Sequence, residues 1–203
     1  MLNLSVQMYN IYFVILYNYS HLIYSLQWNL LILQTNSVKQ IENRIKHMKY
    51  TQLTKEQFEE LHEEFALFLA AQSIDVKEWD SIKKDKPELA DKHLNAFSDF
   101  VWEKVLAKAN YLDHFSKDTL NLFKCNKDNL QRIVVKVKKE GINLLNEKDF
   151  NWFIDNSKDS SIEYLKGEKE YSKEKNLEIF DLIQQGGVVS DGALFEAIHK
   201  IIG

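Results

Sequence analysis

The sequence predicts a mainly α fold with a minor β part: a compact multi-helix domain around one long central helix, with a small two-stranded β element. Apolar residues recur at three- and four-residue steps over much of the chain after residue 48, which is the period of amphipathic helices. The 203 residues include one proline and six glycines, and so few turn-forming residues suit helices better than a sandwich of short strands. A period of two is clear only over 132–138, so we expect the β part to be small.

The central helix is expected over 87–112. The first turn of a helix tolerates the missing N–H of Pro87, and Asp85 just before it is a candidate cap. The apolar stripe consists of Leu94, Phe97, Val101, Val105 and Leu112. The polar strip that remains consists of Lys92, Asp99, Glu103 and Asn110. We expect other elements to cover this helix on several sides, because it is apolar over most of its girth.

Capping patterns place two helices before the central one. Thr54 with Gln57 forms the pattern of a capping box at the start of a helix over 54–71, and Asp75 with Glu78 opens a second helix that ends near residue 84. The inward side of this second helix is expected to carry Val76, Trp79 and Ile82.

Further helices are expected after the central one. Their candidate starts are Ser116, Asn146, Ser172 and Ser190. The short helix after Ser116 would hold Leu120, Leu122 and Phe123. Gly186 supplies the left-handed position that ends the helix after Ser172.

The two-stranded element is expected from 132–138 and 162–166. Ile133, Val135 and Val137 alternate with basic residues, which is typical of a strand with one wet face. Lysines on such a face usually protect an edge strand, so we expect 132–138 to lie at an edge.

The first 47 residues differ from the rest of the chain, since residues 1–38 contain no charged side chain. A signal peptide is opposed by the absence of a basic start and of a small-residue cleavage site. A membrane anchor over 11–33 is one interpretation, with the basic residues of 39–46 on the cytoplasmic side. We favour another: residues 1–47 are an extension outside the fold, Met48 is the true start, and 48–203 form a single α-rich domain.

Composition excludes several kinds of function. The net charge is −4 and only Arg44 and Arg132 are arginines, so broad attraction to nucleic acid is not expected. The single cysteine, Cys125, forms no internal disulfide and suits a reducing cytoplasm. Phosphate-binding glycine loops and the nucleophile elbow have no match in the sequence, and we expect no cofactor.

Four segments carry a resemblance: MKYTQLTKEQFEELHEEFALFLAAQSID, EWDSIKKDKPELA, FSDFVWEKVLAKANYLDHFS and EIFDLIQQGG. Together they resemble a small uncharacterised bacterial family, a domain of unknown function whose members begin at the position of Met48. The resemblance covers Met48 to the C-terminus. It implies a cytoplasmic protein and brings no activity or catalytic residue with it.

Two Glu-x-x-His motifs raise the alternative of a metal-dependent enzyme. Glu59 with His62, and Glu196 with His199, lie on expected helices, where this spacing places both side chains on one face. Di-iron carboxylate proteins use two such motifs with further carboxylates. Chance is a strong competing explanation, because the chain has six histidines and many glutamates. Cys125 with His114 is a weaker candidate for a nucleophile and its base.

We expect a non-catalytic module that binds and modulates another protein. Aromatic and basic residues around the central helix are candidates for the binding surface: Trp79, Trp102, Lys104, Lys108 and Tyr111. A second alternative is weak nucleic-acid binding through the basic strand 132–139, using Arg132, Lys136, Lys138 and Lys139. The sequence identifies neither the partner nor the oligomeric state.

Overall fold

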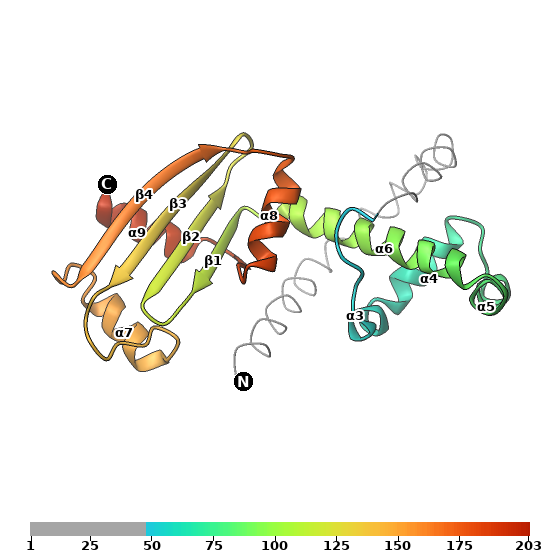
Figure 1. Ribbon diagram of the computed structural model, residues 1–203, viewed down its shortest axis with the longest axis horizontal. Helices are drawn as coiled ribbons and strands as arrows, with labels where there is room; N and C mark the ends of the chain where they lie inside the picture. Colours follow the sequence, from blue (N-terminus) through green and yellow to red (C-terminus); the bar gives the residue numbers. More distant parts are fainter. Residues whose placement is uncertain (1–47) are drawn as a thin grey trace. The chain divides into compact units, whose positions relative to one another are not determined.

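The computed structural model describes residues 48–203 (Figure 1). The expectations about the extension 1–47 and the membrane anchor 11–33 lie outside the described residues. The described part divides into two compact units: a helical unit up to Val105 and a sheet unit from Leu106 to Gly203. That 48–203 form a single domain stays a prediction.

The predicted fold class is wrong, because the sheet is much larger than a two-stranded element. The described residues form seven helices and one five-stranded antiparallel sheet, which is an α+β fold. Three segments account for most of the difference: the expected helix after Ser116 is a strand, the end of the expected central helix is a strand, and a short strand precedes the last helix.

The helical unit contains α3 (Lys55–Glu60), α4 (His62–Ala70), α5 (Val76–Asp85) and most of α6 (Pro87–Lys108). The capping box at Thr54 is confirmed, since its hydroxyl and the Gln57 side chain each accept a backbone N–H of the other residue. The helix expected over 54–71 is interrupted at Leu61, which has non-helical dihedral angles and separates α3 from α4. Asp75 caps α5 as predicted, but Val76 is 76% exposed and does not face inward.

Phe97 of α6 is the centre of the helical unit's core. Its side chain is 1% exposed, and the ring centroids of Phe65 and Phe68 lie 5.1 and 5.3 Å away. Phe58 lies at 5.8 Å. The apolar stripe predicted for the central helix therefore meets the apolar faces of α3 and α4.

Residues 48–53, which we call the N-terminal strap, run along α6. The Asp99 carboxylate accepts the backbone N–H groups of Lys49 and Tyr50 at 2.7 and 2.9 Å, and Glu103 accepts the Tyr50 hydroxyl at 2.7 Å. The Trp102 indole donates to the Thr51 carbonyl. Asp99 and Glu103, which belong to the polar strip expected to face water, thus bind the strap instead.

The sheet contains β1 (Tyr111–Phe115), β2 (Thr119–Cys125), β3 (Asn129–Val137), β4 (Ile162–Glu170) and β5 (Val188–Ser190) in the order β4-β3-β2-β1-β5. The predicted pairing of the two alternating segments is confirmed by β3 and β4, in which Val135 lies opposite Tyr164. The expected edge position of 132–138 is wrong, because β3 lies between β2 and β4.

The sheet unit also contains α7 (Glu147–Asp155), α8 (Lys175–Gln184) and α9 (Ala193–Ile202). Asn146 caps α7 as predicted, and Gly186 has the expected positive φ. Ser190 belongs to β5 rather than to a helix cap, and α9 begins after Gly192.

The two faces of the sheet have different surroundings. One face forms the main core with α7 and α9, which Figure 1 shows at one end of the strands and behind them. The fully buried members of this core are Leu120, Leu122, Ile133, Val135, Phe153, Phe195 and Ile198. Since side chains alternate along a strand, His114, Asn121, Phe123 and Arg132 lie on the opposite face. Leu182 and Gln185 of the α8 region border that opposite face.

Candidate functional site

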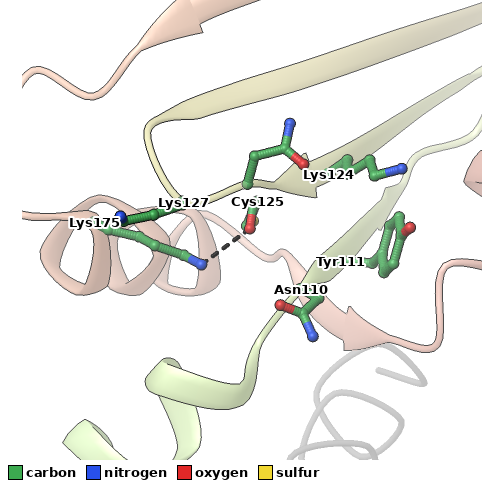
Figure 2. A pocket seen from close by; sticks show the side chains of 7 residues that line it. Asn110, Tyr111, Lys124, Cys125, Lys127 and Lys175 are labelled. Carbon is green, nitrogen blue, oxygen red and sulfur yellow. Dashed lines mark hydrogen bonds between the residues drawn. The ribbon is translucent and has the colours of Figure 1, made fainter.

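The sheet unit has two hollows that contain polar side chains. The first, which we call the lysine pocket, has a volume of 460 Å³ and lies beside the start of β1, the end of β2 and the start of α8 (Figure 2). Its lining residues are Asn110, Tyr111, Lys124, Cys125, Asn126, Lys127 and Lys175. The second is a hollow of 440 Å³ on the sheet face opposite the main core.

Hydrogen bonds to successive backbone groups fix the wall of the lysine pocket. The Cys125 N–H donates to the Asn110 carbonyl at 2.7 Å, and the Lys175 ammonium donates to the Cys125 carbonyl at 3.0 Å. The Tyr171 hydroxyl donates to the Asn126 carbonyl at 3.0 Å. Figure 2 shows Lys175 reaching from α8 to Cys125. Tyr111 is the first residue of β1, and Asn110 lies just before it. The wall is therefore held by residues from three separate parts of the chain.

Lys124 borders the pocket and also joins β2 to α9. Its ammonium lies 2.7 Å from the Glu196 carboxylate, which also accepts the Tyr111 hydroxyl at 2.7 Å. Lys124 lies above the rings of Tyr111 and Phe195, at 5.5 and 5.9 Å from their centroids. The Lys124 ammonium and the Tyr111 hydroxyl keep the pKa of Glu196 below its usual range, so this carboxylate stays ionised at neutral pH.

Cys125 is not poised as a nucleophile. Its side chain is 2% exposed, and burial raises the pKa of the thiol to about 12, so almost none is thiolate at neutral pH. His114 lies opposite Asn121, four residues before Cys125 on β2, a separation of about 13 Å along the strand. The structure therefore separates the two members of the proposed pair.

The second hollow contains a hydrogen-bonded row of three side chains from three neighbouring strands, which we call the arginine row: His114, Asn121 and Arg132. The Arg132 guanidinium lies 5.5 Å from the ring centroid of Phe123, the residue opposite it on β2. It donates to Asn121 Oδ1 at 2.5 Å. The Asn121 amide is 3.3 Å from His114 Nδ1. The ring of Phe123 thus supports the guanidinium while Asn121 fixes its position.

The row determines which nitrogen of His114 carries a proton. Arginine can only donate, so the Asn121 oxygen must face Arg132 and the Asn121 NH₂ must face His114. His114 Nδ1 is then the hydrogen-bond acceptor, which leaves Nε2 as the ring nitrogen that carries a proton. The arginine row therefore offers N–H donors at both ends.

A family model described as a family of unknown function, DUF6495, matches residues 48–203. The chain belongs to this family. The match confirms the predicted resemblance, and its range agrees with the predicted range from Met48 to the C-terminus. No curated protein and no solved structure matches the chain.

Membership of DUF6495 assigns no activity and no site residue. The two Glu-x-x-His motifs lie in different units. Glu59 and His62 are both exposed and lie on either side of the helix break, where His62 Nδ1 is 2.8 Å from the Glu59 carbonyl oxygen. Glu196 is bonded to Lys124 and Tyr111, and His199 packs edge-on against Phe195.

Residues 48–203 contain no group of three or more His, Cys, Asp or Glu side chains placed to hold a metal ion. The metal site built from both motifs stays a prediction. None of the helices within this range combines the length and apolar character needed to cross a membrane. Bacterial origin and cytoplasmic location stay predictions.

The residues predicted to bind a protein partner are divided between the two units: Trp79, Trp102 and Lys104 belong to the helical unit, and Lys108 and Tyr111 to the sheet unit. Trp102 is 6% exposed, and Trp79 packs edge-on against Phe65 at 5.3 Å. Lys104 lies over the Phe100 ring, and Lys108 is the last residue of α6. Tyr111 is on β1, not on the central helix. Partner binding through these residues stays a prediction.

The four basic residues of the segment 132–139 differ in their contacts and do not act as one group. Lys138 pairs with Glu163 at 3.1 Å, and the Lys139 ammonium lies 3.8 Å from the Trp152 ring centroid. Only Arg132 and Lys136 are exposed on the same face of β3. This arrangement gives little support to a continuous path for a nucleic-acid backbone.

The lysine pocket was not predicted from the sequence. Lys175 is 50 residues from the carbonyl that it contacts, and no local pattern predicts that contact. One signal was present: Asn126-Lys127-Asp128 is a polar turn between two apolar segments, as expected between paired strands.

Proposed function

We propose that this protein is a non-catalytic binding module that recognises a carboxylate-bearing segment of another protein through the arginine row. The observation that supports the proposal best is the placement of Arg132. Its guanidinium is exposed, supported by Phe123 and tied to Asn121 by one of its five N–H donors. The remaining donors suit the planar, two-oxygen geometry of a carboxylate.

The surroundings of the row favour a protein segment as the ligand. Val134 and Leu165 lie opposite each other beside Arg132 on the same face of the sheet, and Leu165 is 45% exposed. An acidic side chain on an otherwise apolar segment would complement both the charge and the apolar contacts.

The chemistry of the row favours binding over catalysis. His114 Nδ1 already accepts a hydrogen bond from the Asn121 amide, so this lone pair is occupied and does not face a substrate as a free base. Its Nε2–H and the Arg132 guanidinium are donors only. Such a set stabilises a negative charge but does not itself remove a proton.

A peptide selection tests this proposal. Random peptides displayed on phage are selected on the wild-type protein, and their affinities are measured by fluorescence anisotropy. We expect the selected peptides to share an Asp or Glu position, and we expect Arg132→Ala to weaken binding by about tenfold or more, the loss of a bidentate charge-assisted contact.

Lys136→Ala is the matched control, because it removes the same charge from an exposed position on the same face of the same strand. A smaller loss with Lys136→Ala than with Arg132→Ala supports recognition by the row. Equal losses, or selected peptides without an acidic position, would contradict the proposal.

A further inference from the structure

We infer that the lysine pocket is a binding site for a small phosphorylated molecule, separate from the protein-binding face proposed above. The inference rests on the charge of the pocket, its free hydrogen-bond donors, its size and the way its wall is held.

The lining of the pocket is positively charged. Three of its seven lining residues are lysines, and none is Asp or Glu. Lys124 is balanced by Glu196, which lies outside the lining. Lys127 and Lys175 have no acidic partner in the described chain, and the exposed Asp128 next to Lys127 is not part of the lining. Two lysine charges therefore remain uncompensated at this one hollow.

The pocket also has unused donors at fixed positions. An ammonium group has three N–H donors, and Lys175 uses one on the Cys125 carbonyl. This bond holds the Lys175 ammonium beside the cavity, on the wall that Figure 2 shows facing Asn110. The Asn110 side-chain amide is exposed and makes no hydrogen bond within the described chain. Two donors of the Lys175 ammonium and the Asn110 amide group therefore remain available to a ligand in this pocket.

The size and walls of the pocket favour a small ligand that is recognised by its charge. A volume of 460 Å³ lies within the usual range of small-molecule sites. Tyr111, the one aromatic lining residue, is not open for stacking: a Cβ added at Gly192 would lie 2.4 Å from its ring, and Lys124 lies above the ring. Lysines act as point charges, which suits a multiply charged phosphate better than a single planar carboxylate.

Isothermal titration of the purified full chain with pyrophosphate, at constant ionic strength, tests this inference. We expect saturable binding at one site. Lys175→Gln keeps a donor for the Cys125 carbonyl but removes the charge, and we expect it to weaken binding by about tenfold, as for the loss of one charge-assisted hydrogen bond. Lys127→Ala should also weaken binding, and it disrupts no hydrogen bond of the described fold.

Lys117→Ala is the control. Lys117 is an exposed lysine in the turn between β1 and β2, at the other end of β2 from the pocket. Unchanged affinity in this variant, together with the two losses, supports the site. The inference is overturned if the wild-type protein shows no saturable binding at millimolar pyrophosphate, or if all three variants lose affinity equally. Arg132→Ala distinguishes the two proposals, since only the peptide affinity should depend on it.

Discussion

At the scale of single residues, Asp113 is an acidic side chain at a buried position. It lies on the core face of β1, is 9% exposed, and its Oδ1 atom has no hydrogen-bond partner. Burial raises the pKa of this carboxyl from 3.8 to about 6, although a hydrogen bond with Ser190 partly offsets the shift. An ionised carboxylate at this position destabilises the folded protein.

We predict that Asp113→Asn changes how stability depends on pH. The folded state binds the Asp113 proton more tightly than the unfolded state does, so the free energy of unfolding falls as the pH rises from about 4 to about 6. A shift from 3.8 to about 6 corresponds to about 3 kcal/mol. Urea unfolding at pH 4 and pH 7 should show the variant gaining up to about this amount on the wild type between the two pH values.

The pH dependence of the variant must be compared with that of the wild-type protein, because other carboxyl groups change the free energy of unfolding in the opposite direction. The pKa values of Asp149 and Asp159 are lowered by hydrogen bonds from their neighbours, and these groups favour folding above pH 4. Asp128→Asn, which changes an exposed carboxyl, should give a curve parallel to that of the wild type. Parallel curves for Asp113→Asn as well would show that burial of this carboxyl has no effect on folding.

At the scale of elements, the strap depends on side chains of α6. Asp99 accepts the N–H groups of Lys49 and Tyr50, and the buried Ser98 hydroxyl accepts the N–H of Leu53. Ser98 in turn donates to the Leu94 carbonyl within α6. The strap is thus bound to one helix at several consecutive residues without being a strand.

We predict that Asp99→Ala destabilises the protein by about 2 kcal/mol, since two backbone N–H groups lose a charged acceptor. Hydrogen exchange should show faster exchange of the Lys49 and Tyr50 amides. Asp91→Ala, at an exposed position on the same helix, is the control and should leave both amides protected as in the wild type. Unchanged protection in Asp99→Ala would mean that the carboxylate does not hold the strap.

Some strands could be predicted from the sequence and others could not, and the reason is physical. In β3 only one face is buried in the main core, and the exposed Arg132 and Lys136 make the alternation visible. In β2 both faces are covered: Leu122 faces α9 while Phe123 and Cys125 are buried on the other side. The resulting apolar run has no clear period of two, and such a run is equally compatible with a helix.

The end of the central helix could not be predicted from the sequence for a similar reason. Tyr111 and Leu112 continue the apolar stripe of α6 in the sequence, yet they pair with Lys124 and Phe123 in the sheet. Only knowledge of that pairing places the end of the helix at Lys108. The same holds for both candidate sites, because the contacts of Arg132 and Lys175 join strands and helices that no local pattern connects.

At the scale of the whole molecule, the described parts of the two units differ in how fully the aromatic rings of their cores are buried. The sheet unit contains a continuous cluster of buried apolar residues that includes Leu120, Phe153 and Phe195. In the helical unit Phe97 is fully buried, but the rings around it, such as Phe65 and Phe68, are only half-buried. Buried apolar area is the main favourable contribution to folding.

We therefore predict that the helical unit unfolds at a lower urea concentration than the sheet unit. Cys125 is the only cysteine of the chain, and because its thiol is buried, labelling by a thiol reagent requires the sheet unit to open. Exchange of the Tyr50 amide, whose acceptor is on α6, reports opening of the helical unit. As urea is raised, exchange at Tyr50 should accelerate before labelling of Cys125 does. If both rates instead rise together, with the same dependence on urea, residues 48–203 unfold as one cooperative domain, as the sequence predicts.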